Sequence, residues 1–274
     1  MTPVGSKIFS VMNHSPKYLN SLFLLSPMDT GKLLSQLERL MENDKEGGVA
    51  WTVAWSVAEN FDKLPPDVRN NLLLKLSEKD KAALDVASTV RKNFDMLPEE
   101  VRNQLLLKLK DDRGVSLDIA SSIAKNYDKL PDEIRGILLQ LAQKEESAPS
   151  VAWAGKYNFD KLPEEVRNRL LLTLSDKVKT ALAVSSVIAC NFGDLPFDVK
   201  DILFKLAERN ETAHATEGAD SSFWAVAENY DNLPQDVQSL LFKLKDKASW
   251  DVGKAVEKHA NKIPEDVRRK LLEK

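Results

Sequence analysis

One short motif recurs along most of this chain at nearly constant spacing. The motif is Asn-Phe/Tyr-Asp-x-Leu-Pro, and its first copy runs from Asn60 to Pro65. Successive motif prolines are 33, 33, 32, 33, 38 and 30 residues apart. These prolines are Pro65, Pro98, Pro131, Pro163, Pro196, Pro234 and Pro264; glycine replaces the aspartate in the fifth copy, and the last copy, His-Ala-Asn-Lys-Ile-Pro, is degenerate. Self-similarity at a fixed period of this length indicates a repeat architecture in which each repeat packs mainly against its neighbours.

A helical pattern follows each motif proline. In the first full repeat Val68, Leu72 and Leu76 lie at i, i+4 and i+8, which is one apolar stripe of an amphipathic helix. Proline suits the first turn of a helix, because the N–H that it lacks would have no partner there. The acidic residue two positions later, Asp67 here, faces the positive end of the helix dipole. We therefore predict a first helix in each repeat, helix A, of about twelve residues.

A second helix, helix B, is expected to end at the motif asparagine. Its positions are counted back from that asparagine, so that Val53, Ala54 and Val57 occupy positions −7, −6 and −3 of the first copy. These positions share one face, and their small or branched apolar side chains allow close packing. Asparagine tolerates the left-handed backbone conformation that ends many helices, so we expect it to end helix B in that way. The aromatic residue after it is expected to plug the turn.

Two such helices per repeat predict an all-α fold, specifically an α-solenoid of about seven two-helix repeats of about 33 residues. The first helix pair is less regular, with helix A near Thr30–Glu42 and helix B near Gly48–Asn60. Residues 1–28 are predicted to form an N-terminal helical cap, and residues 29–274 the solenoid, ending in a single capping helix. Glycine and proline total only 22 of 274 residues, which disfavours a sandwich or barrel with a turn every 8–12 residues or so.

The composition of the chain makes some functions less favoured than others. The chain is 43% hydrophobic and 30% charged, with 39 basic and 42 acidic residues and a net charge of −3. No global basic field favours nucleic acid or an acidic membrane surface. The single cysteine, Cys190, excludes an internal disulfide and a cysteine-based zinc site. We find no signal peptide and no run of about 18 apolar residues, so we expect a cytoplasmic protein without a membrane span.

From about Thr30 to Lys274 the chain resembles HEAT-type repeats, the two-helix units of armadillo-like solenoids. The resemblance rests on an aspartate before helix A and a Val-Arg pair within it. In that family the aspartate and arginine side chains form a hydrogen-bonded ladder between repeats. The resemblance implies such a ladder here, although the pair is one residue further apart than is usual in the family. The matching pairs are Asp62/Arg69, Asp95/Arg102, Asp128/Arg135 and Asp160/Arg167.

The most specific irregularity is a set of tryptophans at position −5 of helix B. Three repeats carry Trp55, Trp153 and Trp224 there, whereas the others carry serine or lysine, which indicates that this position lies outside the core. Tryptophan is enriched at binding hot spots, and exposed apolar patches usually mark recognition sites. The alternative is that each indole folds across small neighbours and fills a packing gap. Trp51 and Trp250, at position −9, are expected in the core.

No catalytic constellation stands out. The chain has no Gly-rich phosphate loop, no Gly-x-Ser-x-Gly and no His-Glu-x-x-His sequence. The long link 208–222 contains His214 near acidic residues, which is weak evidence for a metal site. This link is read either as a binding loop or as a tolerated insertion. We predict no enzyme activity, no metal and no cofactor.

Two functions remain open. The first is a non-catalytic scaffold that binds a protein or peptide, of unknown identity, along the face formed by the B helices. HEAT-type proteins are mostly scaffolds and adaptors, as the resemblance implies. The second is a nucleic-acid-binding protein similar to the HEAT-like alkylpurine DNA glycosylases, with Trp55/Glu59 and Trp224/Glu228 as aromatic–acid pairs. The absence of a basic balance makes nucleic acid the less favoured partner.

Overall fold

The computed structural model describes residues 35, 37–39, 41–42, 48–208, 215–246 and 252–273. These residues contain helices and turns and no strand, which confirms the all-α prediction. The chain divides into two compact units. Unit 1 comprises Met1–Ile123 and Leu130–Ile134, and unit 2 comprises Ala124–Lys129 and Arg135–Lys274.

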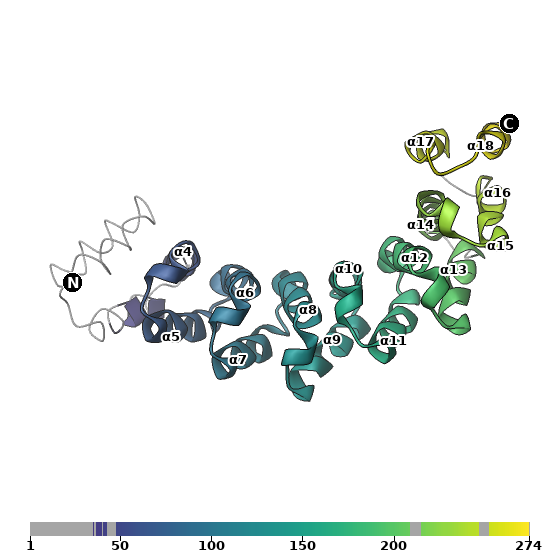
Figure 1. The fold of residues 1–274 in the computed structure, drawn as a ribbon. Coiled ribbons are helices and arrows are strands. Elements are labelled where there is room, and N and C mark those ends of the chain that lie inside the picture. The colour runs from purple at the N-terminus through teal and green to yellow at the C-terminus, as the bar shows by residue number, and fades with distance from the viewer. Residues whose placement is uncertain are drawn as a thin grey trace. The chain divides into compact units, whose positions relative to one another are not determined.

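Unit 1 contains two layers of helices (Figure 1). Its B layer is formed by α4 (Gly48–Glu59), α6 (Ala83–Lys92) and the greater part of α8 (Ser116–Lys125). Its A layer contains α5 (Pro66–Leu76) and α7 (Glu99–Leu109). Helix α4 packs on α5 and α6, and α7 packs on both α5 and α6. Each helix pair therefore contacts the next along the chain.

The core of unit 1 lies between these layers. Val68, Leu72 and Leu76, the predicted stripe of α5, are fully buried. Val53 and Val57 of α4 are buried as well, as expected from positions −7 and −3. The equivalent pairs in α6 and α8, Val86 with Val90 and Ile119 with Ile123, are also buried.

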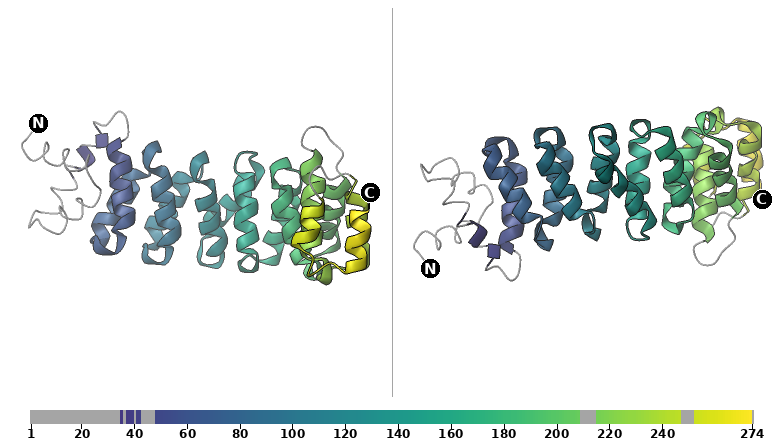
Figure 2. Two further views of the ribbon diagram at one scale, coloured as in Figure 1. Left: turned by 90° about the horizontal axis from the view of Figure 1, so that it is seen from above. Right: turned by 90° about the horizontal axis from the view of Figure 1, so that it is seen from below.

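Unit 2 repeats this arrangement, with a B layer and an A layer that can be followed in Figures 1 and 2. The B layer contains α10 (Ala148–Tyr157), α12 (Ala181–Cys190), α14 (Ala215–Glu228) and α17 (Val252–Lys258). The A layer contains α9 (Asp132–Gln143, from Arg135 on), α11 (Glu164–Ser175), α13 (Phe197–Glu208), α15 (Gln235–Gln238), α16 (Leu240–Leu244) and α18 (Glu265–Leu272). Contacts between α10 and α12, α12 and α14, and α11 and α13 link neighbouring repeats.

A single turn of 3-10 helix follows most B helices, an element that the sequence pattern did not predict. In the motif the aromatic residue and the two after it form this turn, as in η1 (Phe61–Lys63) and η6 (Phe159–Lys161). Phe61 and Phe159 are buried, which confirms that the aromatic plugs the turn. The remaining turns of this kind are η3 (Phe94–Met96), η5 (Tyr127–Lys129), η8 (Phe192–Asp194) and η10 (Tyr230–Asn232). Three others, η2 (Asp80–Ala82), η4 (Arg113–Val115) and η7 (Val178–Thr180), precede B helices.

The motif asparagine ends helix B by a different route from the predicted one. Its backbone is not left-handed: φ is −125° at Asn60 and −126° at Asn158. Instead the side-chain amide donates a hydrogen bond to the carbonyl four residues earlier, over 2.9 Å from Asn60 to Ser56 and 2.8 Å from Asn158 to Ala154. The Ala154 carbonyl also accepts from the backbone N–H of Asn158 at 3.2 Å, so the side-chain amide adds a second donor at the end of the helix. Asn93, Asn191 and Asn229 make the same bond.

The prediction of a link over residues 208–222 is wrong in its second half, because α14 already begins at Ala215. Residues 209–214 lie outside the described residues, as do His214 and the side chains of Glu217 and Asp220. The predicted N-terminal cap, residues 1–28, also lies outside them.

Candidate interaction surface on the B helices

Positions −9 and −5 lie on the outward side of the B layer, because they are one helical turn apart and point the same way. In unit 1 position −9 carries Trp51, Leu84 and Leu117, which are 51%, 57% and 46% exposed. The prediction that Trp51 belongs to the core is therefore wrong. The residues at position −9 are apolar, as core residues are, but their angular position matches that of position −5. Leu182 of unit 2 is exposed as well, and Trp250 lies outside the described residues.

Trp55 of α4 is half-buried and stacks on Trp51. The two ring centroids are 6.4 Å apart and the planes differ by 6°. This spacing is within the range of favourable aromatic pairs. The two indoles form one exposed aromatic surface on the first B helix of unit 1.

Trp153 of α10 is half-buried in unit 2 and stacks on Tyr157, with centroids 5.9 Å apart. Tyr157 is 75% exposed. The Lys156 ammonium lies 5.1 Å from the Trp153 ring centroid, within reach of a cation–π interaction. This part of the surface therefore combines two aromatic rings with a cation.

Trp224 of α14 is also half-buried, and it contacts the following repeat. The Lys258 ammonium lies 4.3 Å from its ring centroid, and the His259 ring meets it edge-on at 4.9 Å. His259 replaces the motif asparagine, and its Nε2 is buried without a hydrogen-bond partner. Burial lowers the pKa of His259 below its ordinary value, an effect that the carboxylate of Glu228 opposes.

The three predicted tryptophans thus keep part of their surface exposed while each packs on a neighbouring ring. The predicted exposure and the alternative, packing of each indole on its neighbours, each describe part of this arrangement. Binding through Trp55, Trp153 and Trp224 stays a prediction. The exposed residues at position −9 were missed, and the signal that could have found them is their spacing of four from position −5.

An ion pair between two B helices lies beside this surface in unit 1. Arg91 Nε of α6 lies 2.6 Å from Asp118 Oδ1 of α8. Burial raises the pKa of Asp118, and the Arg91 guanidinium opposes that shift. Burial also raises the pKa of Asp85, with Lys92 opposing it. Position −1, one further turn along the same side, carries the exposed charged residues Glu59, Lys92 and Lys125.

The arginines of the expected ladder contact aromatic rings and backbone carbonyls. The Arg69 guanidinium lies 4.2 Å from the Phe61 ring centroid and donates to the carbonyls of Phe61 at 3.3 Å and Met96 at 3.1 Å. The bond to Met96 joins one repeat to the next. Arg135 stacks on Tyr127 and donates to its carbonyl at 2.9 Å. Arg102 and Arg167 also lie over the aromatic residue of the turn before their own helix.

The aspartates paired with these arginines in the sequence, Asp62, Asp95, Asp128 and Asp160, are exposed. The carboxylate–guanidinium ladder implied by the resemblance stays a prediction. The stacking on the aromatic ring was missed, although the sequence carries its signal: an arginine or lysine stands eight residues after the aromatic in the first five motifs.

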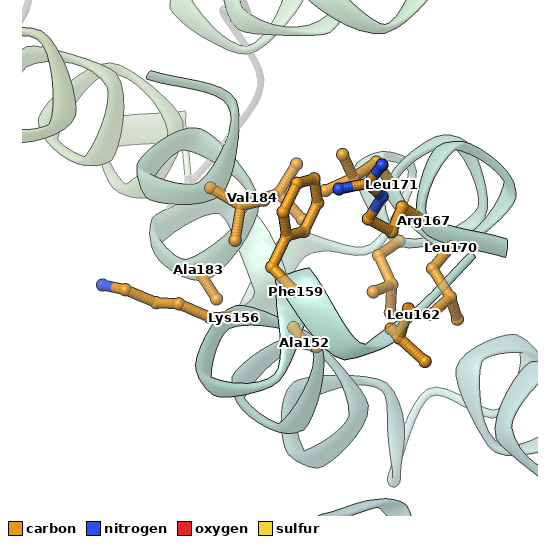
Figure 3. A pocket seen from close by; sticks show the side chains of 12 residues that line it. Ala152, Lys156, Phe159, Leu162, Arg167, Leu170, Leu171, Ala183 and Val184 are labelled. Carbon is orange, nitrogen blue, oxygen red and sulfur yellow. The ribbon is translucent and has the colours of Figure 1, made fainter. Parts of the chain in front are cut away.

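A packing defect lies between α10, α11 and α12 (Figure 3). Its free volume is about 20 Å³, enough for one water molecule, and its lining includes Gly155, Phe159, Arg167 and Val184. Gly155 stands at position −3, where Val57 and Val90 fill the core elsewhere. The missing side chain accounts for the gap. A larger open pocket of about 340 Å³ lies between α11 and α13, bordered by Leu172, Ser175, Asp176, Ile202, Lys205 and Leu206.

Comparisons of the chain with models of known protein families, with curated proteins and with solved structures gave no match. Among the described residues no helix is long and apolar enough to cross a membrane. The same residues contain no group of three or more His, Cys, Asp or Glu side chains placed to hold a metal ion. Cys190 is exposed and donates a hydrogen bond to Asn229 Oδ1 at 3.4 Å.

Proposed function

We propose that this chain is a HEAT-like α-solenoid that acts as a non-catalytic scaffold and binds a protein or peptide on the outward side of its B helices. One observation carries the proposal: large apolar side chains are exposed at the same repeat position on successive B helices, as at Trp51, Leu84 and Leu117. Single exposed apolar residues are normal, whereas a contiguous exposed set usually marks an interaction site. The sequence period, continuous from Pro65 to Pro264, supports the solenoid arrangement.

A nucleic-acid-binding function is the second candidate, and one feature favours it. Lys156 lies beside Trp153, and Lys258 beside Trp224. Aromatic side chains with nearby cations are typical of surfaces that bind single-stranded nucleic acids. The net charge of −3 and the pairing of Arg91 with Asp118 favour a protein partner instead.

An affinity pull-down with the full chain tests the leading proposal. We expect the Trp153→Ser/Trp224→Ser variant to lose partners that the wild-type chain retains, because it removes the aromatic surface from two B helices. The matched control is Phe197→Ser, which removes an exposed aromatic from α13 in the A layer and should retain them.

Unchanged partners for the tryptophan variant, with an unchanged circular dichroism spectrum, would remove these side chains from the binding surface. Binding to single-stranded or duplex DNA that weakens steeply with added salt would support the second candidate instead.

A further inference from the structure

Neighbouring B helices of unit 1 meet along positions −2 and −8 of the repeat. At the junction of α6 and α8, Arg91 at position −2 pairs with Asp118 at position −8, over 2.6 Å between Nε and Oδ1. Position −2 therefore faces the following B helix, and position −8 faces the preceding one. Helices α4, α6 and α8 lie in one layer (Figures 1 and 2), and α4 packs on α6. The same two positions are therefore expected to meet at the junction of α4 and α6.

The junction of α4 and α6 has the acid of this pair without its base. Position −8 of α6 is Asp85, whereas position −2 of α4 is Ala58. Asp85 is partly buried, and within the part of the chain that the structure describes its carboxylate has no hydrogen bond and no ion pair. Burial raises the pKa of Asp85, and Lys92 opposes this effect. A cation beside the carboxylate would offset the cost of burying it.

An exposed indole borders the same junction. Trp51 lies seven residues before Ala58, which is about two helical turns, so both lie on the side of α4 that faces α6. Positions −9 and −8 are adjacent in the repeat, so Trp51 and Asp85 stand near the same level of the two helices. Trp51 is 51% exposed and stacks on Trp55. The junction therefore combines an exposed indole with an unpaired carboxylate.

The other charges of these two helices lie far from that level. Apart from the paired Arg91, the remaining charged residues of α4 and α6 are Glu59 and Lys92, both at position −1. They stand seven or eight residues after Asp85 and Trp51, which is about 10 Å or more along the helix. Their charges are opposite, so Asp85 determines the sign of the local charge. A cationic ligand is complementary to this site.

Arginine fits the site better than lysine. A planar guanidinium can stack on an indole and at the same time donate two parallel hydrogen bonds to a carboxylate, whereas an ammonium is a compact point charge. The next junction shows this use of arginine, since Arg91 is the cation beside Asp118. Residues 1–38 of the chain contain no arginine, so this segment cannot supply the guanidinium.

We propose that unit 1 binds an arginine side chain of a partner protein at the junction of α4 and α6, with the guanidinium stacked on Trp51 and hydrogen-bonded to Asp85. This inference rests on the proposed scaffold function and names the side chain that one part of the surface recognises. The partner's arginine takes the place that Arg91 takes at the next junction, because Ala58 leaves it open.

Nuclear magnetic resonance on the isotope-labelled full chain tests the inference, because each tryptophan indole N–H gives its own signal. The probe is the peptide acetyl-Ser-Leu-Arg-Leu-Ser-amide, and the Trp51→Phe variant identifies the Trp51 signal. We expect the peptide to shift this signal. Asp85→Asn keeps the shape of the side chain and should weaken binding by about tenfold, because hydrogen bonds between two charged groups are lost.

Two further variants use the repeat itself as a guide. Ala58→Arg places an arginine where Arg91 stands in the next repeat. It should pair with Asp85 and weaken peptide binding by about tenfold or more, because the site is then occupied from within. Lys92→Met removes the cation that acts on Asp85 and should leave binding as tight as in the wild type or tighter.

Matched controls separate the charge from the shape. The same peptide with citrulline in place of arginine has nearly the same shape without the charge, and should bind at least about tenfold more weakly. The peptide with lysine should also bind more weakly than the arginine peptide. Asp67→Asn removes an exposed acid from α5 in the A layer, and should change the affinity by less than about twofold.

No shift of the Trp51 signal in the wild-type chain would overturn the inference, as would equal binding of the citrulline peptide or an unchanged affinity of Asp85→Asn. Tighter binding of the lysine peptide, or of a peptide of residues 1–28, at the same signal would overturn it too. Self-association of the chain that Asp85→Asn abolishes would assign the site to a second copy instead of a partner protein.

These results are separable from failure of the scaffold proposal. Loss of partners by the Trp153→Ser/Trp224→Ser variant, without binding of the arginine peptide, would leave the scaffold standing and reject the arginine site.

Discussion

The motif asparagine shows how one functional group determines where a helix stops. Its side-chain amide completes the hydrogen bonding of the last turn, as from Asn158 Nδ2 to the Ala154 carbonyl at 2.8 Å. Its own carbonyl accepts from the amide N–H three residues later, which begins the 3-10 turn, at 2.9 Å from Lys161. Aspartate has the same shape but no donor, so it cannot replace the first of these bonds.

We expect Asn158→Asp to lower the free energy of unfolding by about 1 kcal/mol, because the Ala154 carbonyl loses its side-chain donor, keeps only the backbone N–H and faces a carboxylate acceptor. Urea unfolding followed by circular dichroism measures the change. Asn158→Gly distinguishes the two ways of ending the helix. Glycine would be tolerated if a left-handed backbone were the requirement, whereas the amide role predicts destabilisation by both variants.

His259 makes the last described repeat sensitive to pH. Its folded-state pKa is lowered mainly by burial, and Lys258 and Lys262 add to this effect while Glu228 opposes it. The unfolded chain therefore binds the proton more strongly, and the contribution of His259 to stability is present above pH 6.5 and is lost as the pH falls below it. We expect the melting temperature to fall more between pH 7.5 and about 5.5 in the wild type than in His259→Asn. Equal pH dependence of the two proteins would contradict this assignment.

At the scale of the element, α10 lies beside the packing defect of unit 2. Gly155 lies inside it, and no atom lies within 4 Å of the place where a Cβ would stand. Gly155→Ala should raise stability by about 1 kcal/mol from helix propensity alone. Gly155→Val should add apolar burial, because it restores the residue type of Val57 and Val90 and fills the gap.

The thermal midpoint measures both changes. Gly136→Ala is the matched control, since Gly136 also lies within a helix, α9, with open space beside it. The Gly136→Ala variant gains helix propensity without filling the gap lined by Gly155. A lower midpoint for Gly155→Ala than for the wild type would show that the glycine is required by the backbone rather than tolerated.

Sequence patterns predicted the helices well because their signals are local. The period of the apolar residues fixed the buried stripe of Val68, Leu72 and Leu76, and the proline marked the start of helix A. Residue type alone places Trp51 in the core, whereas its spacing of four from Trp55 puts it on the outward side of α4, where the structure has it. The sequence pattern did not show that Arg69 bonds to the Met96 carbonyl, which depends on how one repeat meets the next.

At the scale of the molecule, the described helix pairs contact their neighbours along the chain within each unit. Stability in such an arrangement is close to a sum of local terms, so damage should stay local. Leu106→Ala removes a fully buried side chain from α7 in unit 1, at a cost of about 2–5 kcal/mol. We expect amide hydrogen exchange to accelerate in α5, α6 and α7, while α12 and α14 in unit 2 keep their protection.

The reciprocal variant is Leu203→Ala, which removes a fully buried side chain from α13. It should accelerate amide hydrogen exchange in the helices of unit 2 instead. Uniform acceleration across all described helices in either variant would indicate a single cooperative core.

The hydrogen bonds that the motif asparagine side chains make at the helix ends affect how the protein ages chemically. An asparagine amide can hydrolyse to a carboxylate without any break in the chain, and the same bond that ends α4, α6, α10, α12 and α14 would then be replaced by two opposed acceptors. Each such event adds one negative charge beside a helix C-terminus, whose dipole already carries that sign. Old preparations should therefore accumulate more acidic species in which individual repeats have loosened, one helix end at a time.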